Sequence, residues 1–325
     1  MELVSDANST SVVSAPTVRR AVIDIGTNSI KLLVADVRNG VVSPVQEESR
    51  QTRLGKNFYQ TRRLQPETVA ATAEAVWEFA EIARERDARS IRVIATSAAR
   101  DALNKHDLIS TVERAAALKV EIISGEQEAA WAFQGVTANS DLAKMPLLLL
   151  DVGGGSTEFI LGYKTKRDFS ESFPMGTVRL LETFPHSDPP VRAELEKCRK
   201  WIKDFLKTKV RPQLGPLLQS KGYRETQLTG TGGTVSILAR METKMVRFDR
   251  EKIEHTVLSL ERITAHRKNL WNLPLAQRRE IVGLPKMRAD VILTGVLIYE
   301  IVMQEFGFTQ LRISTRGLRF AAVMD

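Results

Sequence analysis

The feature that most constrains this chain is an abrupt change of chemistry within residues 147–158. Four leucines, which predict a short buried strand, run directly into Asp151, three glycines, two hydroxyl residues and Glu158. A glycine run lets backbone amides approach a phosphate, because no Cβ keeps them away and positive φ is accessible. Two acids beside a phosphate call for a hard divalent cation between them. The segment therefore predicts a strand followed by a phosphate-binding turn, with a plain flexible turn as the alternative.

A second segment near the N-terminus repeats this pattern. Residues 20–24 form a predicted strand that ends at Asp24, and residues 25–29 (IGTNS) add a glycine and hydroxyl turn before another apolar run. The two turns lie in opposite halves of a chain of 325 residues, which is long enough for about two domains. The repeat predicts a duplicated fold with one phosphate turn from each half.

A third glycine and hydroxyl turn, residues 229–234 (TGTGGT), lies between a short predicted strand and a helix over residues 235–241. A helix that begins there would direct free N–H groups and a partial positive charge at an anion. Glycines are also common at helix starts that bind nothing, so this turn indicates a phosphate site only in combination with the other two.

Charge and composition limit the ligand classes. Lys and Arg outnumber Asp and Glu by 47 to 39, and the resulting pI of about 9.6 favours an acidic ligand. Nucleic acid is disfavoured, because aromatic residues are only 6% and no zinc-finger, helix-turn-helix or RNP motif occurs. None of the four histidines has a partner at zinc-ligand spacing, and neither a Walker lysine nor a Gly-x-Ser-x-Gly elbow is present.

Three features bear on location. Residues 1–18 predict a disordered tail, because the opening stretch is rich in Ser, Asn and Thr and has no apolar core of a secretion signal. The single cysteine, Cys198, cannot form an internal disulfide and suggests a reducing, cytoplasmic compartment. The apolar run over residues 291–302 is too short and too interrupted to span a membrane.

Apolar spacing predicts helices over residues 66–86, 105–118, 124–136, 194–209 and 252–271. Ser124 is the expected N-cap of the third of these helices. Glu128 in its first turn, and Arg100 after the predicted strand 91–95, are candidate site residues. Spacing alone favours a structural role for both, as a packed helix-start carboxylate and a solvated surface arginine.

Six segments together resemble the exopolyphosphatase and guanosine pentaphosphate phosphohydrolase (Ppx/GppA phosphatase) family of the actin, sugar kinase and Hsp70 superfamily. Two of them, residues 121–129 and 150–158, are specific to this family. Ala321 stands where the family usually has glycine. The six segments follow the family's order along the chain and are residues 21–29, 95–101, 121–129, 150–158, 175–179 and 229–234.

The resemblance implies an α/β fold in which two RNase H-like (actin-like ATPase) domains, residues 19–140 and 141–325, face each other across a cleft. It also implies metal-dependent hydrolysis of the terminal phosphoanhydride of inorganic polyphosphate, with Mg²⁺ or Mn²⁺ as cofactor. Guanosine pentaphosphate (pppGpp) or a nucleotide is the alternative ligand. We further expect a homodimer that binds neither nucleic acid nor membrane.

Residue by residue, the resemblance assigns Glu128 to orienting or deprotonating the attacking water, and Arg100 to binding phosphate. This reverses the structural reading of both residues. Asp151 is matched to catalysis and, together with Asp24 and Glu158, to the metal. The residues matched to phosphate contacts are Gly26, Thr27, Asn28, Ser29, Gly153, Gly154, Gly155, Ser156, Thr157, Gly230, Thr231, Gly232, Gly233 and Thr234.

Two other functions stay open at this point, a pppGpp 5′-phosphohydrolase and a nucleotide-binding actin-like or sensory protein without hydrolysis. A sugar kinase is disfavoured, since residues 121–129 match relatives that use water as acceptor. A polyphosphate chain would also need a basic track beyond the reacting phosphate. The candidates for that track are Lys197, Arg199, Lys200, Lys203, Lys207 and Lys209.

Overall fold

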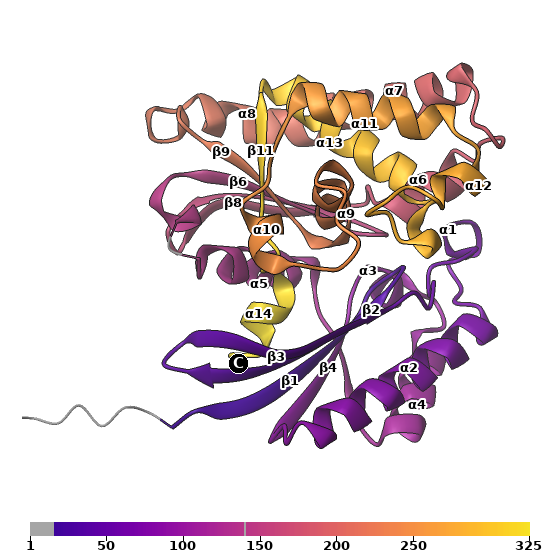
Figure 1. The fold of residues 1–325 in the computed structure, drawn as a ribbon, viewed down its shortest axis with the longest axis vertical. Helices are drawn as coiled ribbons and strands as arrows, with labels where there is room; N and C mark the ends of the chain where they lie inside the picture. The colour runs from indigo at the N-terminus through magenta and orange to yellow at the C-terminus, as the bar shows by residue number, and fades with distance from the viewer. Residues whose placement is uncertain (1–15, 140) are drawn as a thin grey trace, which may run out of the picture.

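The computed structural model describes residues 16–139 and 141–325, so the predicted tail over residues 1–18 lies almost wholly outside the described residues. Two β-sheets, each with helices on its faces, are stacked along the long axis of the molecule (Figure 1). The first sheet comes from the N-terminal half of the chain and the second from the C-terminal half.

The first sheet has the strand order β3-β2-β1-β4-β5. Strand β1 is antiparallel to β2 and parallel to β4, and its pairing with β2 is closed by the turn after Asp24. The strands are β1 (Val18–Ile25), β2 (Ile30–Arg38), β3 (Val41–Arg50), β4 (Ser90–Ala95) and β5 (Val120–Ile122). The helices of this half are α1 (Phe58–Thr61), α2 (Pro66–Glu85), α3 (Ser97–Asp101), α4 (Lys105–Ala116) and α5 (Gly125–Thr137).

The second sheet has the order β10-β11-β9-β6-β7-β8 and repeats the antiparallel pair at its centre. Its strands are β6 (Leu147–Val152), β7 (Thr157–Tyr163), β8 (Lys166–Phe173), β9 (Gln227–Thr231), β10 (Val257–Ser259) and β11 (Gln310–Ile313). The α-helices are α6 (Thr177–Thr183), α7 (Arg192–Phe205), α8 (Arg211–Gln219), α9 (Gly232–Glu242), α10 (Arg250–Glu254), α11 (Leu260–Asn272), α12 (Leu275–Arg278), α13 (Ile292–Phe306) and α14 (Leu318–Ala322). Short helical turns of other types are η1 (Leu142–Lys144), η2 (Leu206–Val210), η3 (Lys221–Tyr223) and η4 (Lys286–Arg288).

Helices α5 and α14 lie between the two sheets (Figure 1). Trp131 of α5 packs with Phe320 of α14 in an apolar cluster on the first sheet. On its other side α5 places Ala129 and Phe133 in a cluster with strands of the second sheet. The last helix of the chain therefore returns to the first sheet, and α5 is fixed against both.

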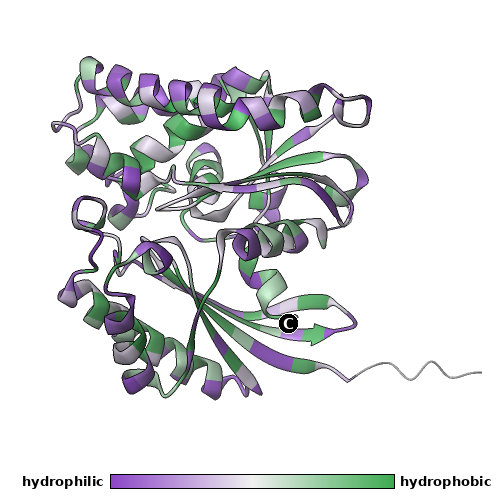
Figure 2. Ribbon diagram, turned by 180° about the vertical axis from the view of Figure 1, so that it is seen from behind, coloured by the Kyte–Doolittle hydropathy of each residue, from purple (hydrophilic) through white to green (hydrophobic). Residues whose placement is uncertain are grey.

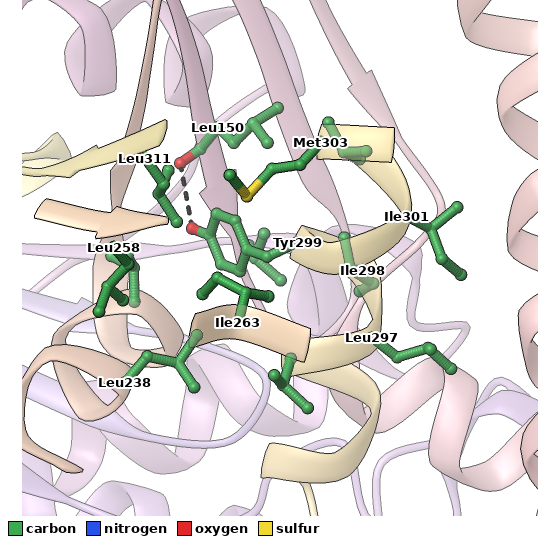
Figure 3. Close-up of a cluster of buried hydrophobic side chains, with 14 of the residues drawn as sticks. Leu150, Leu238, Leu258, Ile263, Leu297, Ile298, Tyr299, Ile301, Met303 and Leu311 are labelled. Carbon is green, nitrogen blue, oxygen red and sulfur yellow. Dashed lines mark hydrogen bonds between the residues drawn. The ribbon is translucent and has the colours of Figure 1, made fainter. Parts of the chain in front are cut away.

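The largest core lies around α13, which is buried on all sides in the second half. Hydrophobic residues run along the strands of both sheets (Figure 2). In Figure 3 the ring of Tyr299 lies among Ile263, Ile298 and Leu311, with its hydroxyl directed at the carbonyl oxygen of Leu150. Burial of aliphatic and aromatic side chains at this scale is the main source of stability for the half that carries Asp151.

One carboxylate is buried in this core and is fully paired. Glu300 of α13 has no exposed surface, and it accepts hydrogen bonds from Arg199 of α7 and Arg267 of α11. Two arginines offset the cost of placing the charge inside the protein. The pairing joins three helices on the side of the second sheet away from the first.

One helix expected from the sequence is broken in the structure. Residues 252–271 divide into α10, β10 and α11, because Val257 and Leu258 pair with β11 and the Ser259 hydroxyl caps α11 by accepting from the amide of Arg262. Residues 194–209 are helical throughout, first in α7 and then in the π-helical turn η2, so this prediction is confirmed. The predictions for residues 66–86, 105–118 and 124–136 are confirmed, as is the Ser124 cap.

The division of the chain into domains at residues 140 and 141 stays a prediction, and α14 of the C-terminal segment packs on the first sheet. Within residues 16–139 and 141–325, no helix combines the length and the apolar character that crossing a bilayer requires.

Replacing Ile298 with Ala tests the α13 core. The side chain is fully buried, so we expect the free energy of unfolding to fall by about 2–5 kcal/mol. Val282→Ala serves as the control, because Val282 is about half exposed, and it should change stability by less than ~0.5 kcal/mol. Urea denaturation of the three proteins is the measurement, and equal losses in both variants would contradict the assigned core.

Candidate active site

The turns after Asp24 and Asp151 have the same backbone structure. In each, the amide of the first glycine donates to the carbonyl of the serine three residues later, from Gly26 to Ser29 at 3.1 Å and from Gly153 to Ser156 at 3.0 Å. Both turns connect antiparallel strands, β1 to β2 and β6 to β7. The repeat inferred from the sequence is therefore a repeat of structure.

The two turns face each other closely. A Cβ built on Gly154 would lie 2.9 Å from the Cβ of Thr27, so only glycine allows this approach. The third turn reaches the same place, because a Cβ on Gly232 would lie 2.4 Å from Oδ1 of Asp151. Gly232 also has φ +89°, which glycine adopts without strain.

A cavity of about 110 Å³ lies where the three turns meet. Most of the predicted phosphate contacts line it, whereas Thr157, Gly230 and Thr234 lie behind the lining. Thr157 donates to the Met175 carbonyl, and Thr234 donates to the Val152 carbonyl at 3.2 Å. The predicted residues that line the cavity are Asp24, Gly26, Thr27, Asn28, Ser29, Glu128, Asp151, Gly153, Gly154, Gly155, Ser156, Thr231, Gly232 and Gly233.

Glu128 enters the cavity from the first turn of α5. Its side chain is buried, and Oε2 accepts a hydrogen bond from Nη1 of Arg100 at 3.0 Å. The same Arg100 nitrogen also donates to the Ile123 carbonyl at 3.1 Å. In this structure Arg100 contacts Glu128 and is not among the residues that line the cavity, and its assignment to phosphate binding stays a prediction.

Burial raises the pKa of four carboxyl groups here, one of which is Asp24. The pKa of Glu158 rises to about 7, through burial and then through the charge of Asp151 opposite it on the β6 and β7 pair. Burial likewise raises the pKa of Asp151 to about 6, although Lys31 lowers it. The pKa of Glu128 rises well above its usual value through burial and the charge of Glu158, against the opposing effect of Arg100.

The acids fit a hydrated divalent cation better than a cage of protein ligands. Among the described residues, no three side chains of His, Cys, Asp or Glu lie close enough together to hold a metal ion. The predicted trio is therefore not one group: Glu158 accepts from Ser172 at 2.7 Å behind the cavity lining. Asp24 and Asp151 do line the cavity, and Oδ1 of Asp24 is buried without a hydrogen-bond partner. Two carboxylates, waters and phosphate oxygens are a usual ligand set for Mg²⁺.

Three cationic side chains in the cavity were missed by the sequence reasoning. Lys31 lies opposite Asp24 in the pairing of β1 and β2, and Arg288 comes from η4 and Arg319 from α14. Burial lowers the pKa of all three, to about 10 for Arg288. Strand alternation after the first turn could have identified Lys31, but no local pattern separates Arg288 or Arg319 from surface arginines.

The six candidates for a basic track lie elsewhere, on α7 and η2, and none of them lines the cavity. Arg199 is paired with Glu300, and Lys200 is paired with Asp204 at 2.5 Å. That part of the sequence prediction is wrong, because α7 packs against α13 on the far side of the second sheet. Four of its lysines, Lys197, Lys200, Lys207 and Lys209, are exposed to solvent.

The arrangement suits transfer of a phosphoryl group to water. Amides and hydroxyls of three turns, three cations and two acids that can hold a metal surround one small space. A carboxylate with a raised pKa lies at its edge, and such a group is a better base than an ordinary carboxylate.

Comparison with known proteins agrees with this chemistry. The model of the "Ppx/GppA phosphatase family" matches residues 33–324. The chain is similar to exopolyphosphatase 2 of Mycobacterium tuberculosis, at 32% identity over 315 residues that cover 92% of this chain and 96% of the relative.

Two solved structures are also similar. One is the Ppx/GppA enzyme of Aquifex aeolicus, with a TM-score of 0.76 and 30% identity over 95% of this chain and 100% of that one. The other is an exopolyphosphatase from Cytophaga hutchinsonii, with a TM-score of 0.84 and 28% identity over 94% of this chain and 96% of that one.

The buried carboxyl pair predicts how stability depends on pH. The folded protein keeps a proton on Glu158 between its usual pKa of 4.5 and about 7, where the unfolded chain has lost it, so wild-type stability falls as pH rises through this window. Gln does not ionise. We therefore expect Glu158→Gln to match the wild type at about pH 4 and to be the more stable protein at about pH 8.

Urea denaturation across this range is the measurement. Glu78→Gln is the control, because Arg50 lowers the pKa of Glu78 and this replacement should bring no gain at high pH. A Glu158→Gln protein that is less stable than the wild type at about pH 8 would contradict the burial described here.

Proposed function

This chain belongs to the Ppx/GppA phosphatase family, and we propose that it is an exopolyphosphatase that releases phosphate from the end of inorganic polyphosphate. The observation that carries the proposal is the cavity itself, where two structurally equivalent glycine turns from opposite halves of the chain meet beside Glu128. Relatives named as exopolyphosphatases support the choice of substrate.

The chain's own residues would bind the terminal phosphates and orient them. Amides of the facing turns point to phosphate oxygens, and Lys31, Arg288 and Arg319 neutralise their charge. Nδ2 of Asn28 is buried without a hydrogen-bond partner, which is the state expected of a donor that awaits a ligand.

Glu128 would orient the attacking water and accept its proton. The water oxygen forms a bond to the terminal phosphorus, and the bond from that phosphorus to the bridging oxygen breaks, so that phosphate and a shortened chain leave. Arg100 positions the carboxylate through the 3.0 Å hydrogen bond.

We propose that Asp24 and Asp151 hold Mg²⁺ or Mn²⁺ together with phosphate oxygens. The cation would neutralise charge on the phosphate chain and on the leaving oxygen. Glu158 would act from behind the lining by raising the pKa of Glu128.

A second candidate substrate is pppGpp. A further cavity of about 450 Å³ adjoins the first and shares Lys31, Arg288 and Arg319 with it. Its wall includes Ile237, Phe248 and Pro285, which offer apolar surface to a nucleoside as well as to a phosphate chain. The homodimer and the cytoplasmic location stay predictions.

Glu128→Gln tests the assignment of the base. The amide keeps the shape of the side chain but cannot accept a proton, so we expect kcat to fall by about 10²- to 10⁴-fold while KM changes little. Glu126→Gln, an exposed neighbour in the same helical turn, is the matched control and should retain wild-type turnover. Phosphate release from defined-length polyphosphate is the assay, and near-normal turnover of Glu128→Gln would refute the assignment.

Metal removal tests the two acids. We expect a chelator to abolish phosphate release and added Mg²⁺ or Mn²⁺ to restore it. Asp24→Asn and Asp151→Asn should each require a higher metal concentration for half-maximal rate, because each removes one charged ligand. Full activity in the presence of chelator would contradict the metal assignment.

Comparing initial rates on polyphosphate and on pppGpp separates the two substrates. We expect the higher kcat/KM with polyphosphate, and the reverse order would favour pppGpp. If neither substrate is hydrolysed while nucleotide binds, the non-hydrolytic actin-like alternative is favoured, and sedimentation with and without nucleotide then tests self-assembly.

A further inference from the structure

We infer that Arg53 is a positioning residue that couples the first phosphate turn to Arg288 across the cleft. The inference rests on the proposed function, in which Arg288 binds substrate phosphate. Arg53 itself does not line the cavity between the turns, so its effect must pass through the groups that it holds.

The backbone of Arg53 is attached to the first turn. Its amide donates to the Asn28 carbonyl at 3.1 Å, and the amide of Gly55 donates to the Thr27 carbonyl at 2.7 Å. Arg53 has φ +52°, a left-handed conformation that is unfavourable for a residue with a side chain. Such conformations persist where the surrounding structure fixes them, and they concentrate at functional sites.

The side chain of Arg53 reaches the opposite half of the chain. Nη1 lies 3.0 Å from Oδ2 of Asp290, and Nη2 donates to the Met287 carbonyl at 3.0 Å. These two acceptors flank Arg288. Asp290 is in turn fixed at the start of α13, because its Oδ1 accepts from the amide of Val291 at 2.9 Å.

Arg288 makes the reciprocal contact. Its Nη1 donates to the Ser29 hydroxyl at 2.8 Å, and its other terminal nitrogen lies 2.8 Å from the position that a Cβ on Gly233 would occupy. Arg288 thus bridges the first and third turns. Arg53 holds the segment on either side of Arg288, and Arg288 holds the last residue of the turn to which Arg53 is attached.

These reciprocal contacts would matter more for the position of Arg288 than for the stability of the protein. The Arg53 and Asp290 side chains are about a third and a quarter exposed, and exposed ion pairs contribute ~0–1 kcal/mol. A displacement of a phosphate-binding cation by about 1 Å, in contrast, can reduce a rate on the order of 10²-fold. Loss of the pair should therefore lower activity while leaving thermal stability almost unchanged.

The test compares the single variants Arg53→Met, Asp290→Asn and Arg288→Met, and it combines Arg53→Met with Arg288→Met in a double-mutant cycle. Phosphate release from tripolyphosphate is the assay. We expect each single variant to lose about 10- to 100-fold in kcat/KM at nearly wild-type Tm. If Arg53 acts through Arg288, adding Arg53→Met to Arg288→Met should change nothing further. Arg50→Met, which breaks the Arg50 to Glu78 pair within the first half, is the matched control and should retain wild-type kinetics.

Three results would overturn the inference. The first is a wild-type kcat/KM in Arg53→Met, and the second is an equal loss of kcat/KM when Arg53→Met is introduced into the wild type and into Arg288→Met. The third is a loss of kcat/KM that follows a fall in Tm. A wild type that releases no phosphate would instead refute the proposed function. Calorimetric affinity for tripolyphosphate then decides the inference in the same variants, with weaker binding expected for Arg53→Met and none of that weakening expected when Arg288 is already replaced.

Discussion

The site depends on the packing of α5 between the two sheets. One side of this helix shares Trp131 with the cluster on the first sheet, and the other side places Phe133 among strands of the second. Glu128 in the first turn of α5 is therefore fixed relative to both glycine turns at once. A carboxylate on a loop would not be held in this way, and a base for an attacking water must be placed to within a fraction of an ångström.

Four carboxyl groups are buried together in this site, and burial disfavours their charged forms. Burial raises the pKa of Asp24, Asp151, Glu128 and Glu158, which means that the protein disfavours their ionised forms. Lys31 offsets part of this cost for Asp24 and Asp151. Under the proposed function, a bound divalent cation and phosphate chain would complete the charge balance of this cavity.

Local patterns in the sequence predict the turns well. An acid at the end of a buried strand, followed by glycine and hydroxyl residues, predicts a turn at Asp24 and at Asp151, and the two turns form the same backbone hydrogen bond. What the sequence does not reveal is which distant residues arrive at the turns. Arg288 and Arg319 come from segments with ordinary local patterns, and only the return of α14 to the first sheet and the placement of η4 bring them to the cavity.

The same limit explains the wrong prediction of the basic track. The lysines of α7 form a strong charge pattern, yet the helix packs with α13 on the outer side of the second sheet. The prediction of a continuous helix over residues 252–271 is wrong for a related reason, because the pairing of Val257 and Leu258 with β11 outweighs their helical spacing. In both segments, contacts between residues far apart in the sequence decided the structure, and a short stretch of sequence does not contain such contacts.

The central claim is that the facing turns bind a phosphate chain and that Asp24 and Asp151 together hold a divalent cation beside it. A crystal structure of the protein with Mn²⁺ and tripolyphosphate, with the anomalous signal used to locate manganese, tests it most directly. The claim predicts a manganese peak bridging these two carboxylates and a phosphate oxygen, with the terminal phosphate facing Glu128. A manganese peak away from both acids, or a phosphate chain bound outside the turns, would contradict it.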